Sequence, residues 1–283
     1  MKYSIKNTKT NNNDCKYDKF FKLVEKSVWF DNTEKNVVIK QANKAFEELV
    51  AGKTKQAKLY RFCGQSGSGK TSQLLSSTLK ILEENKINPV VIAVRNFAHF
   101  HPDYDKLLAK FGKSEIREKT NAFALKCLFV VLEKCLKDGY YIALDVTILD
   151  KNFETEFVSL FIKYNYEVAY QILSVSKPQS NRFIEKREKD KNNFEYGRKI
   201  YTSSKDYFYS ALRSGLRTTI KLLPNIRTIV WSAYNAEPVY DGKMKDCYLH
   251  FAKHRKITKK VVHTSEEMCT FKYNYLTKHL AVK

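Results

Sequence analysis

The chain alternates short apolar runs with longer segments in which apolar residues recur at helical spacing. The run PVVIAV at 89–94 is continuously apolar, which is typical of a parallel strand that is buried on both faces. Other short apolar runs that end at turn-forming residues predict further strands. The expected strands cover residues 58–63, 89–94, 140–144, 168–175, 226–231 and 238–240.

Helices are expected between these strands, where apolar residues lie three and four positions apart. The segment 41–50 has this spacing, and Gly52 ends it, as glycine commonly does. A loop is expected at 99–102 and a turn at 241–242. Because strands alternate with helices, the fold class is α/β, with a mostly parallel sheet and helices on both faces. The expected helices cover residues 20–26, 41–50, 70–84, 115–136, 153–164, 178–190, 203–223 and 265–280.

The size and composition are those of a globular protein. A chain of 283 residues with 43% hydrophobic residues can form one α/β domain with additions. No apolar run approaches the ~18–20 residues that cross a membrane, and the N-terminus lacks the apolar core of a signal peptide. We therefore expect a cytoplasmic protein. The six cysteines form no CxxC pair, which favours free thiols over a zinc site.

The net charge of +21 comes from 51 basic and 30 acidic residues. Such a surface attracts anions, namely nucleotides, nucleic acid or an acidic protein. Most of the basic residues are scattered lysines, so a solvated surface explains the charge equally well. A polynucleotide kinase is the less favoured hypothesis, since no aromatic and basic RNA-binding motif is present.

A glycine-rich motif at 64–71 (GQSGSGKT) matches GxxxxGK[ST] in full, between an expected strand and an expected helix. Its glycines let backbone N–H groups turn toward phosphates, and the helix N-terminus adds partial positive charge. In this motif Lys70 reaches the β- and γ-phosphates, and the Thr71 hydroxyl ligates Mg²⁺. The residues expected to bind ATP or GTP are Gly64, Gln65, Ser66, Gly67, Ser68, Gly69, Lys70, Thr71 and Ser72.

Together with several segments further along the chain, this motif resembles the zeta-toxin family of P-loop kinases. The HP-x-Y-D element in FAHFHPDYDKL is the most distinctive part of the resemblance. The resemblance implies a three-layer P-loop kinase domain at 40–242, after an N-terminal extension at 1–39 and before a basic helical C-terminal extension at 243–283. The matching segments are 64–72, 97–107, 139–147, 181–187 and 197–198.

The family's function gives the expected chemistry of this chain. The resemblance implies a toxin that transfers phosphate from ATP or GTP, with Mg²⁺, to a sugar hydroxyl of UDP-N-acetylglucosamine. Such toxins are usually silenced by a small antitoxin. We therefore expect a nucleotide-sugar as substrate and a small acidic antitoxin as partner, and neither nucleic acid nor a membrane.

Several further site residues are implied by the same resemblance. Arg187 and Arg198 match the two arginines that clamp the transferred phosphoryl group, whose oxygens need positive charge as the bond breaks. Asp145 ends a strand at a position where the family usually has Glu, and Thr147 follows two residues later on the substrate side. Ligands of open α/β sheets bind at the carboxyl ends of the strands, so both residues face the expected crevice.

The sequence departs from the family at the catalytic base. An Asp is expected shortly before the HP element, and that position is Arg95; the basic residue often found three positions later is Ala98. A guanidinium stays protonated and does not accept a proton from a substrate hydroxyl. His101 is placed on the substrate side by the resemblance, and its simpler role is to shape the loop before Pro102.

Three explanations of Arg95 remain open at this stage. The chain is a natural pseudo-enzyme, or another carboxylate has taken over as base, or the chain is an engineered inactive form. Candidates for such a replacement base are Asp103, Asp105 and Asp145. A natural pseudo-enzyme would have a different class of function, that of a non-catalytic nucleotide-binding module that engages a partner protein.

Overall fold

The strands form one six-stranded sheet in the order β2-β3-β1-β4-β5-β6. The computed structural model describes residues 16–27, 31–189, 202–257 and 263–279. Strands β1 to β5 are parallel, and β6 pairs with β5 in the antiparallel direction, which confirms the predicted mostly parallel sheet. The strands are β1 (Lys58–Cys63), β2 (Val90–Ala93), β3 (Ile142–Asp145), β4 (Glu167–Ser174), β5 (Arg227–Ser232) and β6 (Tyr240–Lys243).

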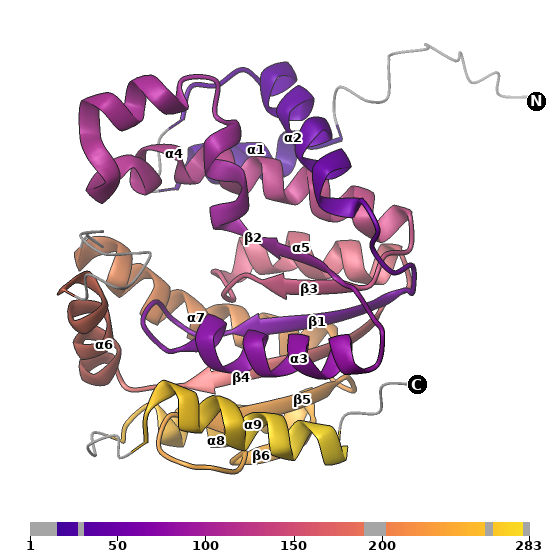
Figure 1. Ribbon diagram of the computed structural model, residues 1–283, viewed down its shortest axis with the longest axis vertical. Coiled ribbons are helices and arrows are strands. Elements are labelled where there is room, and N and C mark those ends of the chain that lie inside the picture. The colour runs from indigo at the N-terminus through magenta and orange to yellow at the C-terminus, as the bar shows by residue number, and fades with distance from the viewer. Residues whose placement is uncertain (1–15, 28–30, 190–201, 258–262, 280–283) are drawn as a thin grey trace, which may run out of the picture.

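Helices cover both faces of the sheet, as Figure 1 shows, so the fold has the three layers expected of a P-loop kinase. Helices α3 and α9 pack on one face, and α5 and α7 pack on the other. The helices are α1 (Asp18–Glu25), α2 (Lys35–Val50), α3 (Ser76–Glu84), α4 (Tyr104–Lys137), α5 (Lys151–Lys163), α6 (Lys177–Lys189), α7 (Thr202–Leu222), α8 (Cys247–His254) and α9 (Ser265–His279).

The side chains of the central strand β1 contribute to the hydrophobic cores on both faces of the sheet. Successive side chains of a strand point to opposite faces of the sheet. Leu59 and Cys63 accordingly belong to the core on the α5 side, whereas Tyr60 and Phe62 belong to the core on the α3 side. Both faces of β1 are therefore covered, and the strand is held in the middle of the molecule.

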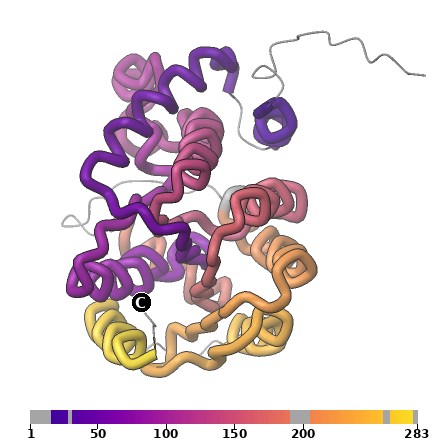
Figure 2. The backbone as a smooth tube through the Cα atoms, turned by 90° about the vertical axis from the view of Figure 1, so that its right-hand side faces the viewer, coloured from indigo at the N-terminus to yellow at the C-terminus, as the bar shows by residue number. Residues whose placement is uncertain are grey.

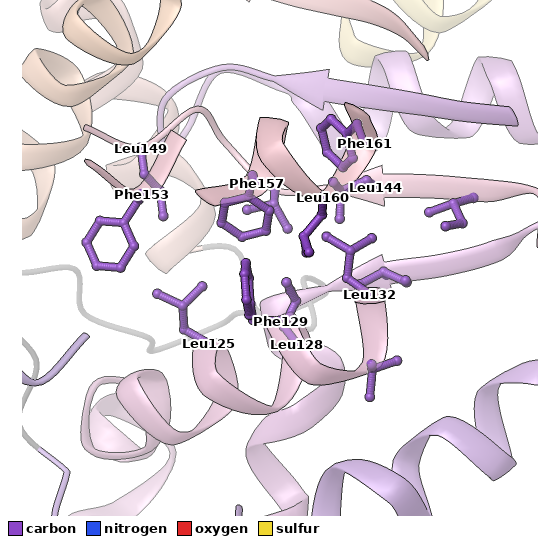
Figure 3. Packing of buried hydrophobic residues seen from close by; sticks show 14 of the residues in the cluster. Leu125, Leu128, Phe129, Leu132, Leu144, Leu149, Phe153, Phe157, Leu160 and Phe161 are labelled. Carbon is purple, nitrogen blue, oxygen red and sulfur yellow. The ribbon is translucent and has the colours of Figure 1, made fainter. Parts of the chain in front are cut away.

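The larger core lies between α4, α5 and the sheet (Figure 3). Leu128 and Phe129 of α4 face Phe153 and Phe157 of α5. Phe20 of α1 stacks on Phe129 and meets Phe157 edge-on. Burying one such aromatic side chain stabilises the fold by about 1.5–3 kcal/mol. Helix α1, within the predicted N-terminal extension, therefore contributes to the same core as the kinase residues.

Three predicted elements between β1 and β3 need correction. The helix predicted over 70–84 starts with a π-helical segment, Lys70–Leu75 (η1), before α3, and such segments occur frequently at functional sites. The first two residues of the loop predicted at 99–102 lie instead in a 3₁₀ helix, Val94–Phe100 (η2). Helix α4 begins at Tyr104, earlier than predicted, and is kinked at Gly112, where φ is 68°.

The C-terminal part of the chain also differs from the prediction. Residues 241–242 lie within β6 and do not form a turn, and helix α8 was not predicted. Helix α9 packs beside α3 (Figure 2), where Ser77 Oγ donates to the Cys269 carbonyl at 3.0 Å and Leu276 is buried. The division of the chain at 243 stays a prediction, and α9 is firmly part of the packed structure.

Within the described ranges, no helix is both long and apolar enough to cross a bilayer. The described cysteines are free thiols, and all except the half-buried Cys269 are buried, namely Cys63, Cys127, Cys135 and Cys247.

Candidate active site

The glycine-rich loop joins β1 to η1 and has the backbone that its glycines allow. Gly67 and Gly69 have φ values of 75° and 90°, in the left-handed region that side chains disfavour. A Cβ atom at Gly67 would lie 2.5 Å from the Ser180 carbonyl oxygen. The motif therefore needs glycine at this position for two reasons, its dihedral angle and the close approach of α6.

Two polar contacts fix this loop to the segment after β4. The Gln65 Nε2 donates to the Val175 carbonyl oxygen at 2.5 Å, and the Ser180 hydroxyl donates to the Ser66 carbonyl oxygen. Both contacts come from residues at the carboxyl end of β4 or the start of α6. The conformation of the loop is thus held by the protein itself, before any phosphate is bound.

Asp145 is the centre of the site. Lys70 forms an ion pair with Oδ1, and Oδ2 accepts hydrogen bonds from the Thr71 hydroxyl at 2.8 Å and from Arg95 Nη1 at 2.7 Å. The Asp145 side chain is fully buried. Burial alone raises the pKa of this carboxyl, but the charges of Lys70 and Arg95 outweigh it and hold the pKa well below its ordinary value.

Strand register explains why these residues meet. Ala93 of β2 pairs with Asp145 of β3, so Arg95 follows directly at the same sheet edge. Arg61 of β1 pairs with Leu144, and the glycine-rich loop begins three residues later, at Gly64. The carboxyl ends of parallel strands share one edge, which is where ligands of open α/β sheets bind.

The fit of this site to Mg²⁺ can be tested on its donors. A hydroxyl and a carboxylate, Thr71 and Asp145, are oxygen ligands of the kind that Mg²⁺ uses. However, both carboxylate oxygens already accept from protein donors, and one donor is the permanently charged guanidinium of Arg95. The donor set as arranged does not fit a divalent cation.

The two predicted clamp arginines have different outcomes. Arg187 lies on α6, and Ser180, Ile184 and Arg187 follow one another at the four- and three-residue spacing of one helix face. Ser180 and Ile184 both approach Gly67, so this face of α6 is turned to the glycine-rich loop. The Nε and Nη2 atoms of Arg187 are shielded from solvent. Arg198 lies outside the described residues.

The residues predicted on the substrate side do not all gather at the loop. Ala98 lies in η2, three residues after Arg95, and residues three apart share one side of a 3₁₀ helix. Thr147 lies just beyond Asp145, and its Oγ1 is buried with no hydrogen-bond partner in the described part of the chain. His101, in contrast, is used elsewhere in the fold.

His101 ties the start of α4 to the segment before α2. Its Nδ1 accepts the Asp103 N–H at 3.1 Å, while Nε2 lies 3.4 Å from Thr33 Oγ1 and 3.9 Å from Asp31 Oδ1. The Asp31 carboxylate is in turn paired with Lys126 at 3.2 Å. Both ring nitrogens thus face protein partners, which agrees with the loop-shaping role of His101, and its predicted substrate contact stays a prediction.

No other carboxylate named as a replacement base faces the glycine-rich loop. The Asp103 side chain is half exposed and pairs with Lys106 at 2.8 Å, which lowers the pKa of its carboxyl. Asp105 lines a separate cavity of about 310 Å³ with Lys44 and Glu48 of α2. Asp145 carries the ion pairs described above. The structure therefore offers none of the three as an available proton acceptor.

One element of the site's support was missed in the sequence. Arg61 of β1 is fully buried and donates to both carboxylate oxygens of Glu154 in α5, at 2.7 and 2.8 Å. Tyr170 of β4 and Thr219 of α7 complete the network, with hydrogen bonds of 3.0 Å to Arg61 and 2.8 Å to Glu154. The signal was available: a charged residue in the middle of the apolar strand KLYRFC needs a buried partner.

Known proteins resemble this chain in sequence. The sequence model of the zeta toxin family matches residues 44–245. Toxin zeta of Streptococcus pyogenes is 26% identical over 140 residues, which cover 49% of this chain and 47% of that protein. Toxin zeta of Enterococcus hirae is 27% identical over 136 residues, which cover 47% and 46%. The chain thus spans about half the length of the curated relatives that it matches.

The fold has a solved counterpart. A chain from the structural characterisation of the PezAT chromosomal toxin–antitoxin system of Streptococcus pneumoniae superposes with a TM-score of 0.59 at 20% identity. The match covers 87% of this chain and 98% of that chain. At this identity the likeness concerns the fold alone. Because the family match extends over most of the sequence and includes the glycine-rich loop, Arg95 and Asp145, the chain belongs to the zeta toxin family.

Proposed function

We propose that this chain is a phosphotransferase scaffold of the zeta-toxin type. Its donor is ATP or GTP, and its acceptor is a hydroxyl of a nucleotide-sugar, UDP-N-acetylglucosamine. The observation that supports the proposal most is the meeting of Lys70 and Thr71 with the buried Asp145 at the carboxyl ends of the parallel strands. This arrangement gathers phosphate-binding groups at the edge where such sheets bind ligands.

Each residue then has a role in holding the donor. The N–H groups of the loop and the start of η1 hold the β- and γ-phosphates, and the Lys70 ammonium turns from Asp145 to the phosphates. Arg187, on the face of α6 turned to the loop, stabilises the equatorial oxygens of the transferred group. Arg198 completes this clamp in the proposal on the resemblance alone.

The same proposal predicts that phosphate transfer to the acceptor is slow. The acceptor oxygen needs a group that takes its proton and orients it, and Arg95 stands where the family has that group. A guanidinium does not accept a proton near neutral pH. Its ion pair with Asp145 also removes the nearest carboxylate from that task. General-base catalysis of this kind is typically worth ~10²–10⁴-fold in rate.

A second function is favoured by the same arginine. A chain that binds nucleotide without turnover would act as a binding module for a partner protein. The partner that the family relationship suggests is a small acidic antitoxin, and the net charge of +21 suits an acidic surface. The two functions differ in one observable, the appearance of phosphorylated product.

The test is transfer of labelled γ-phosphate from ATP to UDP-N-acetylglucosamine by the unchanged chain, with Lys70→Ala as the background. We expect product to accumulate far more slowly than the 1–100 s⁻¹ that is usual for kinases. Loss of that product in Lys70→Ala assigns it to this site. Turnover in the usual range would contradict the missing base, and an absence of product with retained ATP binding would favour the binding module.

A further inference from the structure

We infer that Arg95 provides the positive charge that a divalent cation supplies in other P-loop sites, so that this chain binds nucleoside triphosphate without Mg²⁺. The inference rests on the proposed nucleotide site and adds a property to it. In P-loop enzymes generally, the metal is held between the loop hydroxyl and a strand-end Asp, and it neutralises the β- and γ-phosphates. Here those two groups are Thr71 and Asp145.

The first argument is geometric. Asp145 Oδ2 receives the Thr71 hydroxyl at 2.8 Å and Arg95 Nη1 at 2.7 Å, so the guanidinium contacts the same oxygen as the metal-ligating hydroxyl. Lys70 pairs with the other carboxylate oxygen before it turns to the phosphates. A cation bound between Thr71 and Oδ2 would have to displace the charged hydrogen bond from Arg95, and such bonds are among the stronger hydrogen bonds in proteins.

The second argument is the charge of the site. Lys70 and Arg95 together with Asp145 carry a net charge of +1, since two cations face one anion. With Asp at position 95 the same three positions would carry −1. The difference of two charges equals that of one Mg²⁺. With the family's Asp at this position, the site lacks two positive charges, which a divalent cation would supply. In this chain the Arg95 side chain supplies them.

Burial makes this charge effective. The Asp145 side chain is fully buried, and that of Lys70 is 16% exposed, so their interactions are weakly screened. Arg95 is 32% exposed and makes one hydrogen bond within the described residues, to Asp145. Its remaining N–H groups can donate to phosphate oxygens, as guanidinium groups do at many phosphate sites. The positive charge of Arg95 also repels a divalent cation from the Asp145 carboxylate.

The experiment measures the Kd of ATP by titration calorimetry, in excess MgCl₂ and in EDTA at equal ionic strength. For the unchanged chain we expect the two Kd values to agree within about threefold, because the site already carries the needed charge. Arg95→Asp should weaken binding in EDTA by at least about tenfold relative to MgCl₂. Arg95→Lys, which keeps the charge, should behave like the unchanged chain.

Two controls keep the result interpretable. Lys40→Ala removes an exposed positive charge on α2 and should leave both Kd values unchanged. Melting temperatures of all variants show that each is folded, and Arg95→Leu gives a second test should Arg95→Asp prove unstable. For Arg95→Leu, which loses one charge only, the expected Mg²⁺ dependence is intermediate.

The outcomes separate the inference from the proposed function. Mg²⁺-dependent binding by the unchanged chain would overturn the inference and leave the nucleotide site intact. Mg²⁺-independent binding by both the unchanged chain and Arg95→Asp would remove Arg95 from this role. Failure to bind ATP under either condition would refute the proposed nucleotide site, and the inference with it.

Discussion

Changing Arg95→Asp and Ala98→Arg together is expected to raise phosphate transfer to UDP-N-acetylglucosamine by at least about a hundredfold, the lower end of what general-base catalysis contributes. The Asp supplies the missing proton acceptor, and Asp145 is released from one of its two ion pairs. Both substitutions act on the same side of η2, because the positions lie three residues apart in a 3₁₀ helix. Initial rates in excess MgCl₂ measure the effect.

The single variants are the matched controls for this prediction. Ala98→Arg alone leaves Arg95 in place and should give no gain. Arg95→Asp alone restores the base and should give a large part of it. No gain from the double change, with ATP binding retained, would mean that position 95 does not face the acceptor or that the acceptor is a different molecule.

Glu154→Gln is expected to destabilise the fold by about 3–5 kcal/mol, because it leaves the guanidinium of Arg61 charged and unpaired in the core. Both side chains are completely buried. Burial lowers the pKa of Arg61, but the Glu154 carboxylate outweighs this effect and keeps the pKa above its ordinary value. With its partner neutralised Arg61 loses that support, but a guanidinium stays protonated in proteins, so the charge remains buried and unpaired. The free energy of unfolding in urea, followed by circular dichroism, measures the loss.

Two variants show whether the loss comes from the pair. Glu156→Gln changes a neighbouring residue of α5 that pairs with the exposed Lys19, and it should cost less than about 1 kcal/mol. Replacing both members, Arg61→Met with Glu154→Leu, should recover most of the stability, because no charge is then left buried alone. Equal losses for Glu154→Gln and Glu156→Gln would contradict this account of the network.

The parts of the fold that could be predicted are those with a strong local signal. Strand β1 was predicted with its observed bounds, since an apolar run there ends at the glycine-rich motif. The early start of α4 was missed because Gly112 lies inside it and reads as a break. Helix α2 starts at Lys35, earlier than predicted, and its first turns pack against α4, where Val38 is buried and its carbonyl oxygen accepts from Cys127 Sγ at 3.6 Å.

Only the part of the site that is contiguous in the chain could be predicted from the sequence. The loop residues are contiguous, so the motif alone identified them. The contact between Arg95 and Asp145 joins residues 50 positions apart, and only the pairing of β2 with β3 brings them together. The departure at Arg95 was evident in the sequence. Its ion pair, and the commitment of His101 to Asp31 and Thr33, became evident only in three dimensions.

The central claim, that the loop around Lys70 binds a nucleoside triphosphate, is tested most directly by the melting temperature with and without millimolar ATP. A ligand at about 100 times its Kd adds about 2.7 kcal/mol of stability, which corresponds to a rise of roughly 5–10 °C for a domain of this class. We predict a rise of this size for the unchanged chain and for Lys40→Ala, and its loss in Lys70→Ala. A melting curve of the unchanged chain that ATP does not move, or an equal rise in Lys70→Ala, would contradict the claim.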